Sequence, residues 1–532
     1  MSIDRVPVLV VGGGLAGMSA ALFLAYHGVA SVLAERHRTT SIHPKARGQT
    51  PQTMEALRIA GIAEAAIAAG PSGDSRLHIT IAESVVGRTL HTIVEDALDL
   101  SHLSPGGSAM ASQERMELIL ADRATELGAQ IRFSTRMEGL TQDAEGVTAT
   151  LRDTITGQVQ TVRADYLIAA DGHRSPIRTA LGIGTHGRGS LNHYMMWLFE
   201  AELGHLIDET TVTLYYLQNP ALHGGNGALV TTDHPGRYAL AAEYHPDRGE
   251  KPGDFTSERA TEQIRTAIGI PDLPVRILHS DETEFAARVA DRFSAGRVHL
   301  IGDAAHVMPP TGGQGGNMAL MDGFYLAWKL AMVVKGAAGP GLLASHDAER
   351  RPIAELLVEQ QYANLVHRMA PHLADGSEAA PVDPAALFLG YRYPSGAIVS
   401  EPGDDGSLLE DPSAPTGCPG SRAPHVPLVR DGMPISTIDL FGSSFVLLTG
   451  SRGQRWRPAA DEVAHRLGMQ LAVHQIGADG LADPTGTWAH RYHVTDSDAV
   501  LIRPDRSIAW RSTEHDNPAQ SMETALRHVL DR

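Results

Sequence analysis

The sequence predicts an α/β protein of several domains: a parallel sheet first, then an antiparallel sheet, then a separate C-terminal α/β unit. Near the N-terminus, the apolar run Val8–Val11 is followed at once by three glycines and an apolar helical pattern. Between residues 185 and 281, strand-like runs such as TVTLYYLQN alternate with Gly, Pro and Asn. From about residue 422, strand-like and helix-like runs alternate again. At 532 residues, the chain is too long for one ordinary core.

Composition excludes several classes of protein. Lys and Arg number 44 and Asp and Glu 62, a net charge of −18 that disfavours nucleic acid and anionic lipid as partners. The sole cysteine, Cys418, excludes an internal disulfide and a thiolate zinc cluster and fits a reducing compartment. We find no apolar run of 18 residues, no signal-peptide pattern and no metal-ligand spacing. We therefore expect a cytoplasmic protein with no metal, membrane or nucleic-acid partner.

The opening glycines form a phosphate-binding pattern. Val8–Val11 reads as a buried parallel strand, and Gly12, Gly14 and Gly17 match GxGxxG. The first glycine permits a tight turn, the second lets a phosphate approach the backbone, and the third lets the helix pack on the strand. The helix expected from about Leu15 to His27 directs its first N–H groups at that phosphate.

An acidic residue completes the pattern. The run ASVLAER reads as a second strand ending at Glu35, 23 positions after Gly12, where a carboxylate can bind ribose hydroxyls. Together, strand, glycines, helix and acid predict a Rossmann-like dinucleotide site. The alternative is a glycine-rich turn in an unrelated α/β domain.

Two later stretches indicate which dinucleotide is bound. A buried strand leads to Asp171-Gly172, and another leads to Gly302-Asp303. A Pro- and Gly-rich loop with glycines at 312, 313, 315 and 316 follows the second, ahead of a long helix. A carboxylate at a strand end can accept from a sugar hydroxyl, and an exposed backbone at a helix start suits a polarisable group. Each dipeptide alone is a common turn, but their order is distinctive.

These stretches occur in the order typical of class A flavoprotein monooxygenases of the para-hydroxybenzoate hydroxylase fold. The sequence resembles this family over essentially its whole length, most closely the aromatic polyketide hydroxylases such as the aklavinone and angucycline hydroxylases. HPKARGQTPQTMEALRIAGI from His43, SQERMELIL around Gln113 and Arg115, and LAWKL at Leu326–Leu330 also match. The most specific stretch is Gly302-Asp303 with PPTGGQGGN after it.

The resemblance implies a non-covalently bound FAD. The glycine loop would hold its pyrophosphate, Glu35 the adenosine ribose, and Asp303 the ribitol or pyrophosphate region. Gln113 would contact the flavin, and Asp171 would serve both FAD and the incoming NADPH or NADH. The implied FAD-binding residues are Gly12, Gly14, Leu15, Ala16, Gly17, Glu35, Arg36, Gln113, Asp171, Gly172, Asp303, Pro309, Gly315, Gly316 and Asn317. His306 is expected to be structural.

Three basic residues are candidates for activating a substrate. The family often carries PRA where this chain has Pro44-Lys45-Ala46, and lysine cannot form the bidentate contacts of arginine. Arg47 could then take over part of that role. By resemblance, Arg368 in RMAPH would reach toward the substrate. The alternatives are a solvated basic loop for Lys45 and Arg47, and a helix-end charge for Arg368.

The resemblance also implies three domains. Residues 1–184 with 282–375 would bind FAD, 185–281 would form a sheet roofing the substrate, and 384–532 would be thioredoxin-like. Without a CxxC pair, this last domain would have a structural role or form a dimer contact. The protein would be a monomer or a homodimer. The residues expected to form flat apolar walls for a small aromatic substrate are Met196, Trp197, Tyr215 and Tyr216. Each could instead be a core residue of its sheet.

The implied reaction is hydroxylation of an aromatic, phenolic polyketide-type compound. NAD(P)H would reduce FAD, and the reduced flavin would take up O2 as a C4a-hydroperoxide that transfers oxygen to the ring. The same scaffold could instead perform epoxidation, Baeyer–Villiger oxidation or oxidative decarboxylation. A non-catalytic flavoprotein that binds an aromatic ligand is a further alternative. The five tryptophans contain no W-x-W, which argues against a flavin halogenase.

Overall fold

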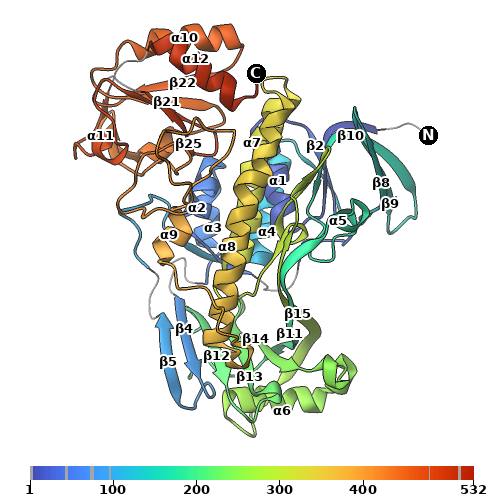
Figure 1. Ribbon diagram of the computed structural model, residues 1–532. Coiled ribbons are helices and arrows are strands. Elements are labelled where there is room, and N and C mark those ends of the chain that lie inside the picture. The colour runs from blue at the N-terminus through green and yellow to red at the C-terminus, as the bar shows by residue number, and fades with distance from the viewer. Residues whose placement is uncertain (1–3, 42–45, 72–76, 95–97, 479, 513–516) are drawn as a thin grey trace.

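The computed structural model describes residues 4–41, 46–71, 77–94, 98–478, 480–512 and 517–532. Two large sheets and a C-terminal unit make up the molecule (Figure 1). The parallel sheet lies at the upper right of the view, the antiparallel sheet in its lower part, and the C-terminal unit, coloured orange to red, at the upper left. The predicted α/β class is confirmed.

The first sheet has the order β16-β17-β10-β1-β2-β7, with β9 and β8 continuing antiparallel from β10. Its core strands are parallel and buried because they consist of short apolar runs covered on both faces. Its strands are β1 (Asp4–Val11), β2 (Ser31–Ala34), β7 (Gln130–Arg132), β8 (Thr135–Asp143), β9 (Gly146–Asp153), β10 (Val159–Ala169), β16 (Ser294–Ala295) and β17 (Val298–Leu300).

Helices α1 and α7 pack closely on each other beside this sheet. A Cβ at Gly323 of α7 would stand 2.5 Å from the backbone N of Ala20 in α1, so the contact requires glycine. Ser19 Oγ also donates to the Leu320 carbonyl, with 2.6 Å between the oxygens. The α-helices before residue 390 are α1 (Leu15–Tyr26), α2 (Pro51–Ile59), α3 (Ala63–Ala68), α4 (Gln113–Glu126), α5 (Pro176–Ala180), α6 (Ser257–Ile268), α7 (Gln314–Val334), α8 (Ala344–Arg368) and α9 (Pro384–Leu389).

The second sheet has the order β18-β15-β11-β14-β13-β12-β4-β5 and is antiparallel except between β12 and β4. It contains two strands from residues 77–94, a segment that the sequence analysis placed in the FAD-binding domain, so it is larger than the predicted 185–281 unit. Its strands are β4 (Leu77–Ala82), β5 (Thr89–Val94), β11 (Thr185–Glu200), β12 (Val212–Gln218), β13 (Asn226–Thr231), β14 (Arg237–Tyr244), β15 (Arg276–Ala290) and β18 (His306–Val307). A two-stranded ribbon, β3 (Arg47–Gln49) with β6 (Ala109–Ser112), completes this half.

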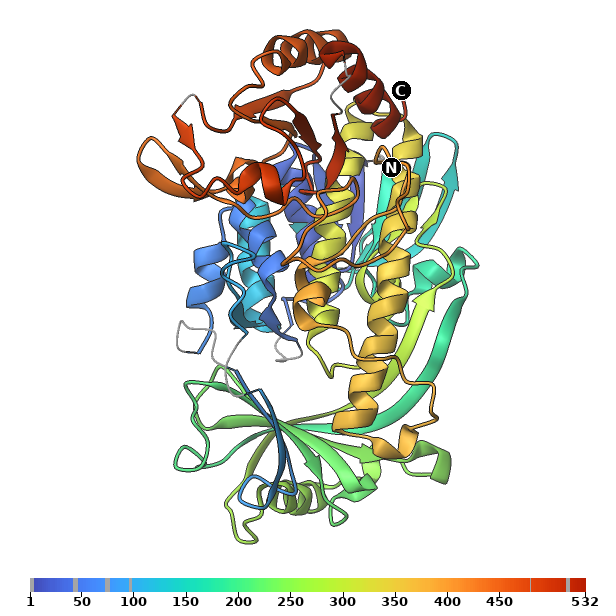
Figure 2. The same ribbon diagram turned by 60° about the vertical axis from the view of Figure 1, so that its left-hand side comes forward.

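Different helices cover the two faces of the second sheet. The end of α8 packs on one face through Leu365 and Met369, and α6 packs on the other through Ile264. In the turned view, α6 lies beyond the sheet, away from the parallel-sheet region (Figure 2). The α8 face is therefore the one that faces the parallel sheet.

The C-terminal unit has a four-stranded sheet of order β22-β21-β24-β25, with β21 and β22 parallel and the other pairs antiparallel. A three-stranded sheet, β20-β19-β23, lies beside it. The elements are β19 (Pro427–Arg430), β20 (Met433–Ser436), β21 (Phe445–Thr449), β22 (Leu471–Gln475), β23 (Leu481–Ala482), β24 (Ala499–Ile502), β25 (Ile508–Arg511), α10 (Trp456–Leu467), α11 (Trp488–Arg491) and α12 (Pro518–Val529). Trp328 of α7 belongs to the same apolar cluster as α10 and α12, so the unit shares its core with the rest of the chain.

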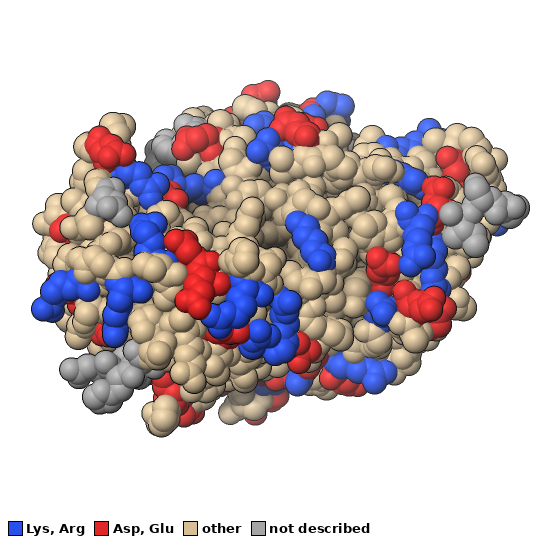
Figure 3. Space-filling view, turned by 90° about the horizontal axis from the view of Figure 1, so that it is seen from above, with Lys and Arg blue, Asp and Glu red and all other residues tan. Residues whose placement is uncertain are grey.

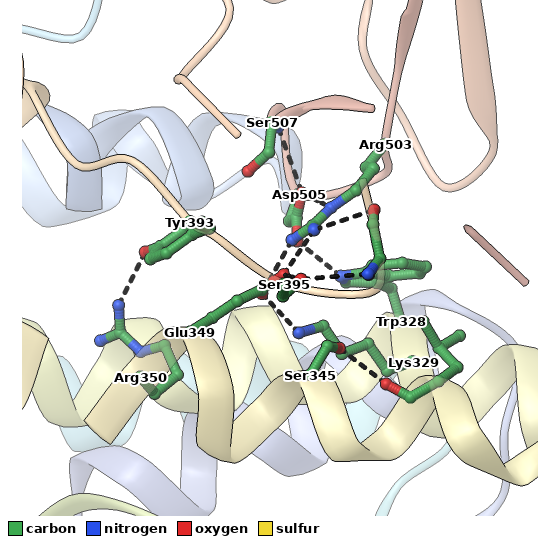
Figure 4. Close-up of polar contacts among 12 residues, drawn as sticks. Trp328, Lys329, Ser345, Glu349, Arg350, Tyr393, Ser395, Arg503, Asp505 and Ser507 are labelled. Atoms are coloured by element: carbon green, nitrogen blue, oxygen red, sulfur yellow. Dashed lines mark hydrogen bonds and ion pairs between the residues drawn. The ribbon is translucent and has the colours of Figure 1, made fainter. Parts of the chain in front are cut away.

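Buried charges join the C-terminal unit to α7 and α8 (Figure 4). Glu349 accepts from Lys329 Nζ at 2.6 Å and from Arg503 Nη1 at 2.6 Å, and none of these side chains is exposed. Arg503 also pairs with Asp505, which accepts the Trp328 indole N–H at 2.8 Å. Burial alone raises the pKa of Glu349, but the charges of Arg503 and Lys329 prevail and lower it to about 2. The carboxylate is thus ionised and fully paired.

A second buried group ties the unit to α2. Glu55 accepts from Arg506 Nη1 at 2.7 Å and from Ser104 Oγ at 2.7 Å, and it pairs with Arg422. The C-terminal unit is therefore fixed to the parallel-sheet region at two separate places.

Charge is mixed on the face seen from above. Blue and red side chains are interspersed there, so the acidic excess is not concentrated on that face (Figure 3). Among the described residues, the helices include none with the length and apolarity needed to cross a membrane.

Candidate active site

Three predicted motifs meet at one edge of the parallel sheet. Strands β17, β10 and β1 are parallel neighbours. Gly12 follows β1, Asp171 follows β10, and Gly302 and Asp303 follow β17, so all four lie at the carboxyl ends of the strands. The chain continues from β1 to β2 on one side of β1, while β10 lies on the other. Open α/β sheets bind ligands at such a switch point.

The glycines of the first motif have different roles. Gly12 has φ +106°, and a Cβ there would stand 2.1 Å from the Ala170 carbonyl oxygen. A Cβ at Gly17 would stand 1.9 Å from the Gly12 oxygen. At Gly14, by contrast, the nearest atom to a Cβ would be Glu117 Oε1 at 3.8 Å. The fold therefore requires Gly12 and Gly17, whereas Gly14 leaves space beside the backbone.

Glu35 lies against this loop. Its Oε2 accepts the Gly13 N–H at 2.6 Å, and its Oε1 accepts the His37 N–H at 2.7 Å. The Glu35 side chain is 10% exposed, while its neighbour Arg36 is exposed. The carboxylate predicted to bind a ribose is thus one hydrogen bond away from the phosphate loop.

Asp171 caps a helix. Its two oxygens accept from Ser175 Oγ at 2.5 Å and from the Ile177 N–H at 3.0 Å, at the start of α5. Burial raises the pKa of Asp171 above its ordinary value, against the effect of these two hydrogen bonds. Gly172 continues the turn with φ +86°. Both carboxylate oxygens therefore already have partners within the protein.

Asp303 differs from Asp171 in this respect. It is exposed and forms no hydrogen bond or ion pair with any residue that the structure describes. Gly302 before it has φ +57°, and a Cβ there would stand 2.7 Å from the Cβ of Ala16 in α1. The turn therefore packs on the start of α1 and presents a carboxylate that can accept from a ligand hydroxyl.

Helix α7 begins at the same edge without a side-chain cap. Its N-cap is Gly313, with φ +66°, and no acidic residue lies in the first turn. A Cβ at Gly316 would stand 2.9 Å from Ala46 Cβ and 3.2 Å from Leu15 Cδ1, whereas Gly315 is less crowded, with Met308 at 3.6 Å. Pro309, ahead of this loop, is buried. The first N–H groups of α7 are thus available to an acceptor.

Asn317 has a structural role through its side chain. Its Oδ1 accepts from the Thr50 N–H and from Thr53 Oγ1, and its Nδ2 donates to the carbonyls of Gly48 and Gly313. All four hydrogen-bonding positions of the amide are occupied. Asn317 therefore joins the start of α7 to the β3 region and leaves no side-chain group for a cofactor.

A small cleft lies between these elements. Leu15, Gln113, Gly316 and Asn317, all predicted to bind FAD, line it together with Ala46. Gln113 is held there because its backbone N–H donates to the Ala46 carbonyl at 2.8 Å. The structure thus brings residues 15, 113, 316 and 317 into one cavity.

His306 is buried beside this site. Its Nε2 lies 2.7 Å from Asp322 Oδ2, and neither side chain is more than 1% exposed. Burial raises the pKa of Asp322, but the charges of His306 and Arg350 outweigh it and hold that pKa below its ordinary value. This position suits the structural role predicted for His306.

The predicted substrate walls lie on opposite faces of the second sheet. Met196 and Tyr216 are on the face covered by α8, beside Met369. Trp197 and Tyr215 are on the other face, in the cluster under α6, where Trp197 is fully buried. Adjacent residues of a strand point to opposite faces of the sheet. Only one residue of the pair Met196 and Trp197, and one of the pair Tyr215 and Tyr216, can therefore face the parallel sheet.

The α8 face of the sheet is not completely covered. Ile79, Met196, Leu214 and Ala228 lie on it, and each is half-buried. Partly covered apolar side chains on a face turned toward the FAD region provide a surface for a flat apolar molecule.

Arg368 joins this sheet to the loop ahead of α7. Its Nη1 donates to the Thr311 carbonyl at 2.5 Å, and its own carbonyl accepts from Gln218 Nε2 at 3.2 Å. The Tyr216 side chain lies beside it: burial raises the pKa of Tyr216, and Arg368 acts in the opposite direction. Lys45 lies outside the described residues.

Arg47 has a partner that the sequence analysis missed. Its guanidinium bonds to Asp233, in the turn between β13 and β14, and Arg115 Nε lies 3.2 Å from the other oxygen of that carboxylate. A lone Asp in TTDHPG resembles an ordinary turn residue, so no local signal could have identified it. Its partners are remote in the chain, 186 positions away in the case of Arg47.

The groups at this edge fit FAD. The uncapped N-termini of α1 and α7 supply N–H donors for phosphate and ring oxygens. The space at Gly14 allows close approach, and Asp303 offers a free acceptor for a sugar hydroxyl. No cluster of three or more His, Cys, Asp or Glu that could hold a metal ion occurs in the part of the chain that the structure describes.

Comparison with known proteins agrees with this assignment. A family model described as FAD binding domain matches residues 5–361, and one described as aromatic-ring hydroxylase, C-terminal, matches residues 416–532. Aklavinone 12-hydroxylase RdmE of Streptomyces purpurascens is 43% identical over all of both chains. The 4-methyl-5-nitrocatechol 5-monooxygenase of a Burkholderia species is 39% identical over 99% of this chain and 98% of its own.

A solved structure also matches the whole chain. The crystal structure of aklavinone-11 hydroxylase in a ternary complex with FAD and aklavinone superposes with a TM-score of 0.94, at 42% identity over all of both chains. The chain therefore belongs to the FAD-dependent aromatic-ring hydroxylases and is a flavoprotein monooxygenase, as its sequence predicts.

Proposed function

We propose that this enzyme uses NADPH or NADH and O2 to hydroxylate a phenolic ring of an aromatic polyketide. The observation that carries the proposal is the half-buried apolar face of Ile79, Met196, Leu214 and Ala228, turned toward the FAD region. The relatives named for aklavinone support the substrate class. The nitrocatechol relative supports a phenol as the reacting group.

FAD would be held at the carboxyl edge of the parallel sheet. The glycine loop and the start of α1 would bind its pyrophosphate, Glu35 its adenosine ribose, and Asp303 a sugar hydroxyl. Gln113, Gly316 and the first N–H groups of α7 would surround the ring system. When bound and reduced, FAD supplies the activation of dioxygen.

The side chains of this enzyme would position the substrate and exclude water. Met196 and Tyr216 would contact its rings, while Trp197 and Tyr215 would support the sheet from its other face. Arg368, held by the Thr311 carbonyl, would direct its charge at the substrate from the junction of loop and sheet. Arg47 and Lys45 would favour ionisation of the phenol, which makes the ring a better nucleophile.

A turnover experiment tests the proposal. The purified protein is assayed for oxidation of NADPH and of NADH, with and without a panel of phenolic anthraquinones, naphthacenes and 4-methyl-5-nitrocatechol, under ¹⁸O2. We expect at least one polycyclic phenol to accelerate oxidation and to gain one ¹⁸O on a ring carbon, located by NMR. If the label is instead inserted into a C–C bond, the reaction is a Baeyer–Villiger oxidation. If it is found in an epoxide, the reaction is an epoxidation. Absence of stimulation and label with the whole panel would contradict the proposal.

Two further properties belong to the proposal. We propose a cytoplasmic location, supported by the sole cysteine, and a monomer or homodimer. Light scattering after size exclusion measures the second, and a mass above that of two chains would contradict it.

A further inference from the structure

Asp233 connects the two large sheets. It lies in the turn after β13, in the second sheet, and its carboxylate bonds to Arg47 at the start of β3. Arg115 of α4 forms an ion pair with its other oxygen, with 3.2 Å between Nε and Oδ2. The Asp233 side chain is 3% exposed and that of Arg47 10%. The ion pair of Arg47 with Asp233 is thus almost fully buried, and it links the region that binds FAD to the sheet proposed to bind substrate.

The backbone of Arg47 lies beside the FAD cleft. Its neighbours Ala46 and Gly48 both line the cleft, and its carbonyl would be 3.8 Å from a Cβ at Gly313, the N-cap of α7. One guanidinium nitrogen, Nη2, is bonded to Asp233. The other, Nη1, is buried and has no hydrogen-bond partner among the described residues. A buried donor without a partner is costly, so such a nitrogen indicates a place where a ligand acceptor binds.

The charge balance points to the same ligand chemistry. Two arginines share one carboxylate, which leaves one positive charge in excess. Arg115 is 40% exposed, so water screens much of its charge. Arg47 is buried, and burial lowers its pKa, with the Asp233 carboxylate acting against that shift. The excess positive charge is therefore most effective at Arg47, where it favours an anionic oxygen.

We propose that Asp233 is a positioning residue for the ring hydroxylation: its carboxylate holds Arg47 so that Nη1 binds the ionised hydroxyl of the phenolic substrate. This inference rests on the proposed function, whose substrate carries that hydroxyl. Arg47 would touch the substrate, and Asp233 would act through Arg47. A bridge that only joined the two sheets would affect stability without affecting the ionisation of a bound phenol.

A coloured phenol measures that ionisation directly. The FAD-loaded protein is mixed with 1,2-dihydroxyanthraquinone, and the absorbance of the bound probe is titrated with pH. The variants are Asp233→Ala, Asp233→Asn, Arg47→Met and the double variant Asp233→Ala with Arg47→Met. Asp272→Ala, an exposed carboxylate near α6, is the matched control. FAD content and thermal unfolding are recorded for each, and Asp233→Asn replaces Asp233→Ala if the latter does not fold.

We expect the wild-type protein to lower the pKa of the bound probe by at least about one unit, as a nearby cation does. Asp233→Ala and Arg47→Met should each abolish this shift, and the double variant should lose no more than either one, because both act through the same contact. Asp233→Asn keeps an acceptor for Nη2 and should restore part of the shift.

Three results would overturn the inference. The wild-type protein could leave the pKa of the probe unchanged. Asp233→Ala could keep or enlarge the shift, meaning that the carboxylate acts only as an opposing charge. The two single effects could be additive, meaning that the residues act separately. Failure of the proposed function looks different, since the probe would behave as expected while no phenol gained oxygen from O2.

Discussion

Asp322 and Gly302 are joined by a hydrogen bond of 2.9 Å from the Gly302 N–H to Asp322 Oδ2. The other oxygen of this buried carboxylate accepts from Arg350 Nε at 2.9 Å. Arg350 in turn donates to Tyr393 Oη at 2.8 Å, beside the buried charges that hold the C-terminal unit (Figure 4). The turn that presents Asp303 is therefore anchored by two helices behind it, so the backbone that carries this side chain is held in place.

Asp303→Ala should weaken FAD binding. The change removes an acceptor that can bond to a sugar hydroxyl, and a hydrogen bond to a charged group contributes about 1.5–3 kcal/mol. We expect the dissociation constant of FAD to rise about tenfold or more, measured by flavin fluorescence during reconstitution of the apoprotein. Asp272→Ala serves as the control for loss of one exposed carboxylate. Equal FAD affinity in the two variants would exclude Asp303 from the site.

Arg368→Met, Arg47→Met and Lys45→Met test activation of the substrate. Loss of a contact made in the transition state lowers kcat and kcat/KM together. We expect at least one of the three to keep its FAD while releasing hydrogen peroxide in place of hydroxylated product, measured as peroxide per NADPH consumed. If all three remain fully coupled, the pocket acts by shape and exclusion of water alone.

Glu349→Gln should destabilise the protein strongly. The change leaves Lys329 and Arg503 buried without their shared carboxylate, and breaking a buried ion pair costs about 3–5 kcal/mol. Urea unfolding followed by tryptophan fluorescence measures the loss. The matched control is Glu138→Gln, which breaks an exposed pair with Arg152 and should change stability little. A Glu349→Gln protein as stable as this control would show that the buried cluster does not stabilise the domain junction.

Stability should fall below about pH 6.5. Burial lowers the pKa of His299 to about 3 and of His346 to about 4. Between those values and the ordinary pKa of about 6.5, the unfolded chain binds more protons than the folded one, so acid favours unfolding. The contribution of each histidine is complete above pH 6.5 and is lost as the pH falls through this window.

His299→Asn should therefore reduce the pH dependence. Removing one such histidine lowers the slope of the unfolding free energy against pH by up to about 1.36 kcal/mol per pH unit. Urea titrations between pH 4.5 and 7 measure the slope, and His465→Asn, on the exposed side of α10, is the control. Identical slopes in the two variants would show that His299 does not contribute to the acid sensitivity.

Cys418→Ser should retain full activity. The thiol is half-buried, and its Sγ lies 3.7 Å from Arg511 Nη2 and 3.9 Å from Glu401 Oε2, contacts that a hydroxyl can replace. Product formation and FAD content are measured side by side. Loss of turnover with FAD still bound would indicate a redox role for the C-terminal unit.

The cofactor region could be predicted from the sequence because its glycines are required by backbone geometry. Gly12 and Gly17 have no room for a Cβ, and such constraints leave a local spacing that can be recognised. The carboxyl ends of parallel strands then bring Asp171 and Asp303 to the same edge. The spacing of a motif does not predict what each side chain binds. Asn317 was expected to bind FAD, but its side-chain amide is occupied by hydrogen bonds within the protein.

The substrate side was harder to predict because both faces of its sheet are covered. Buried residues on each face make β11 and β12 apolar in adjacent positions, so the sequence does not distinguish the face of Met196 from that of Trp197. The pairing of β12 with β4 and the bond from Asp233 to Arg47 link segments more than 100 residues apart. No local pattern records such contacts.

Trp328 has consequences for how the chain is made. Its indole N–H reaches Asp505, 177 positions later, and its ring completes an apolar cluster with α10 and α12. During synthesis, α7 and α8 leave the ribosome long before Arg503 and Asp505, which lie in the last 30 residues of the chain. Until then, this side of the flavin-binding part faces water with its tryptophan and charges uncovered. Apolar surface left uncovered in this way favours aggregation, so the contact of α7 with α10 and α12 has to form promptly once the last residues are made.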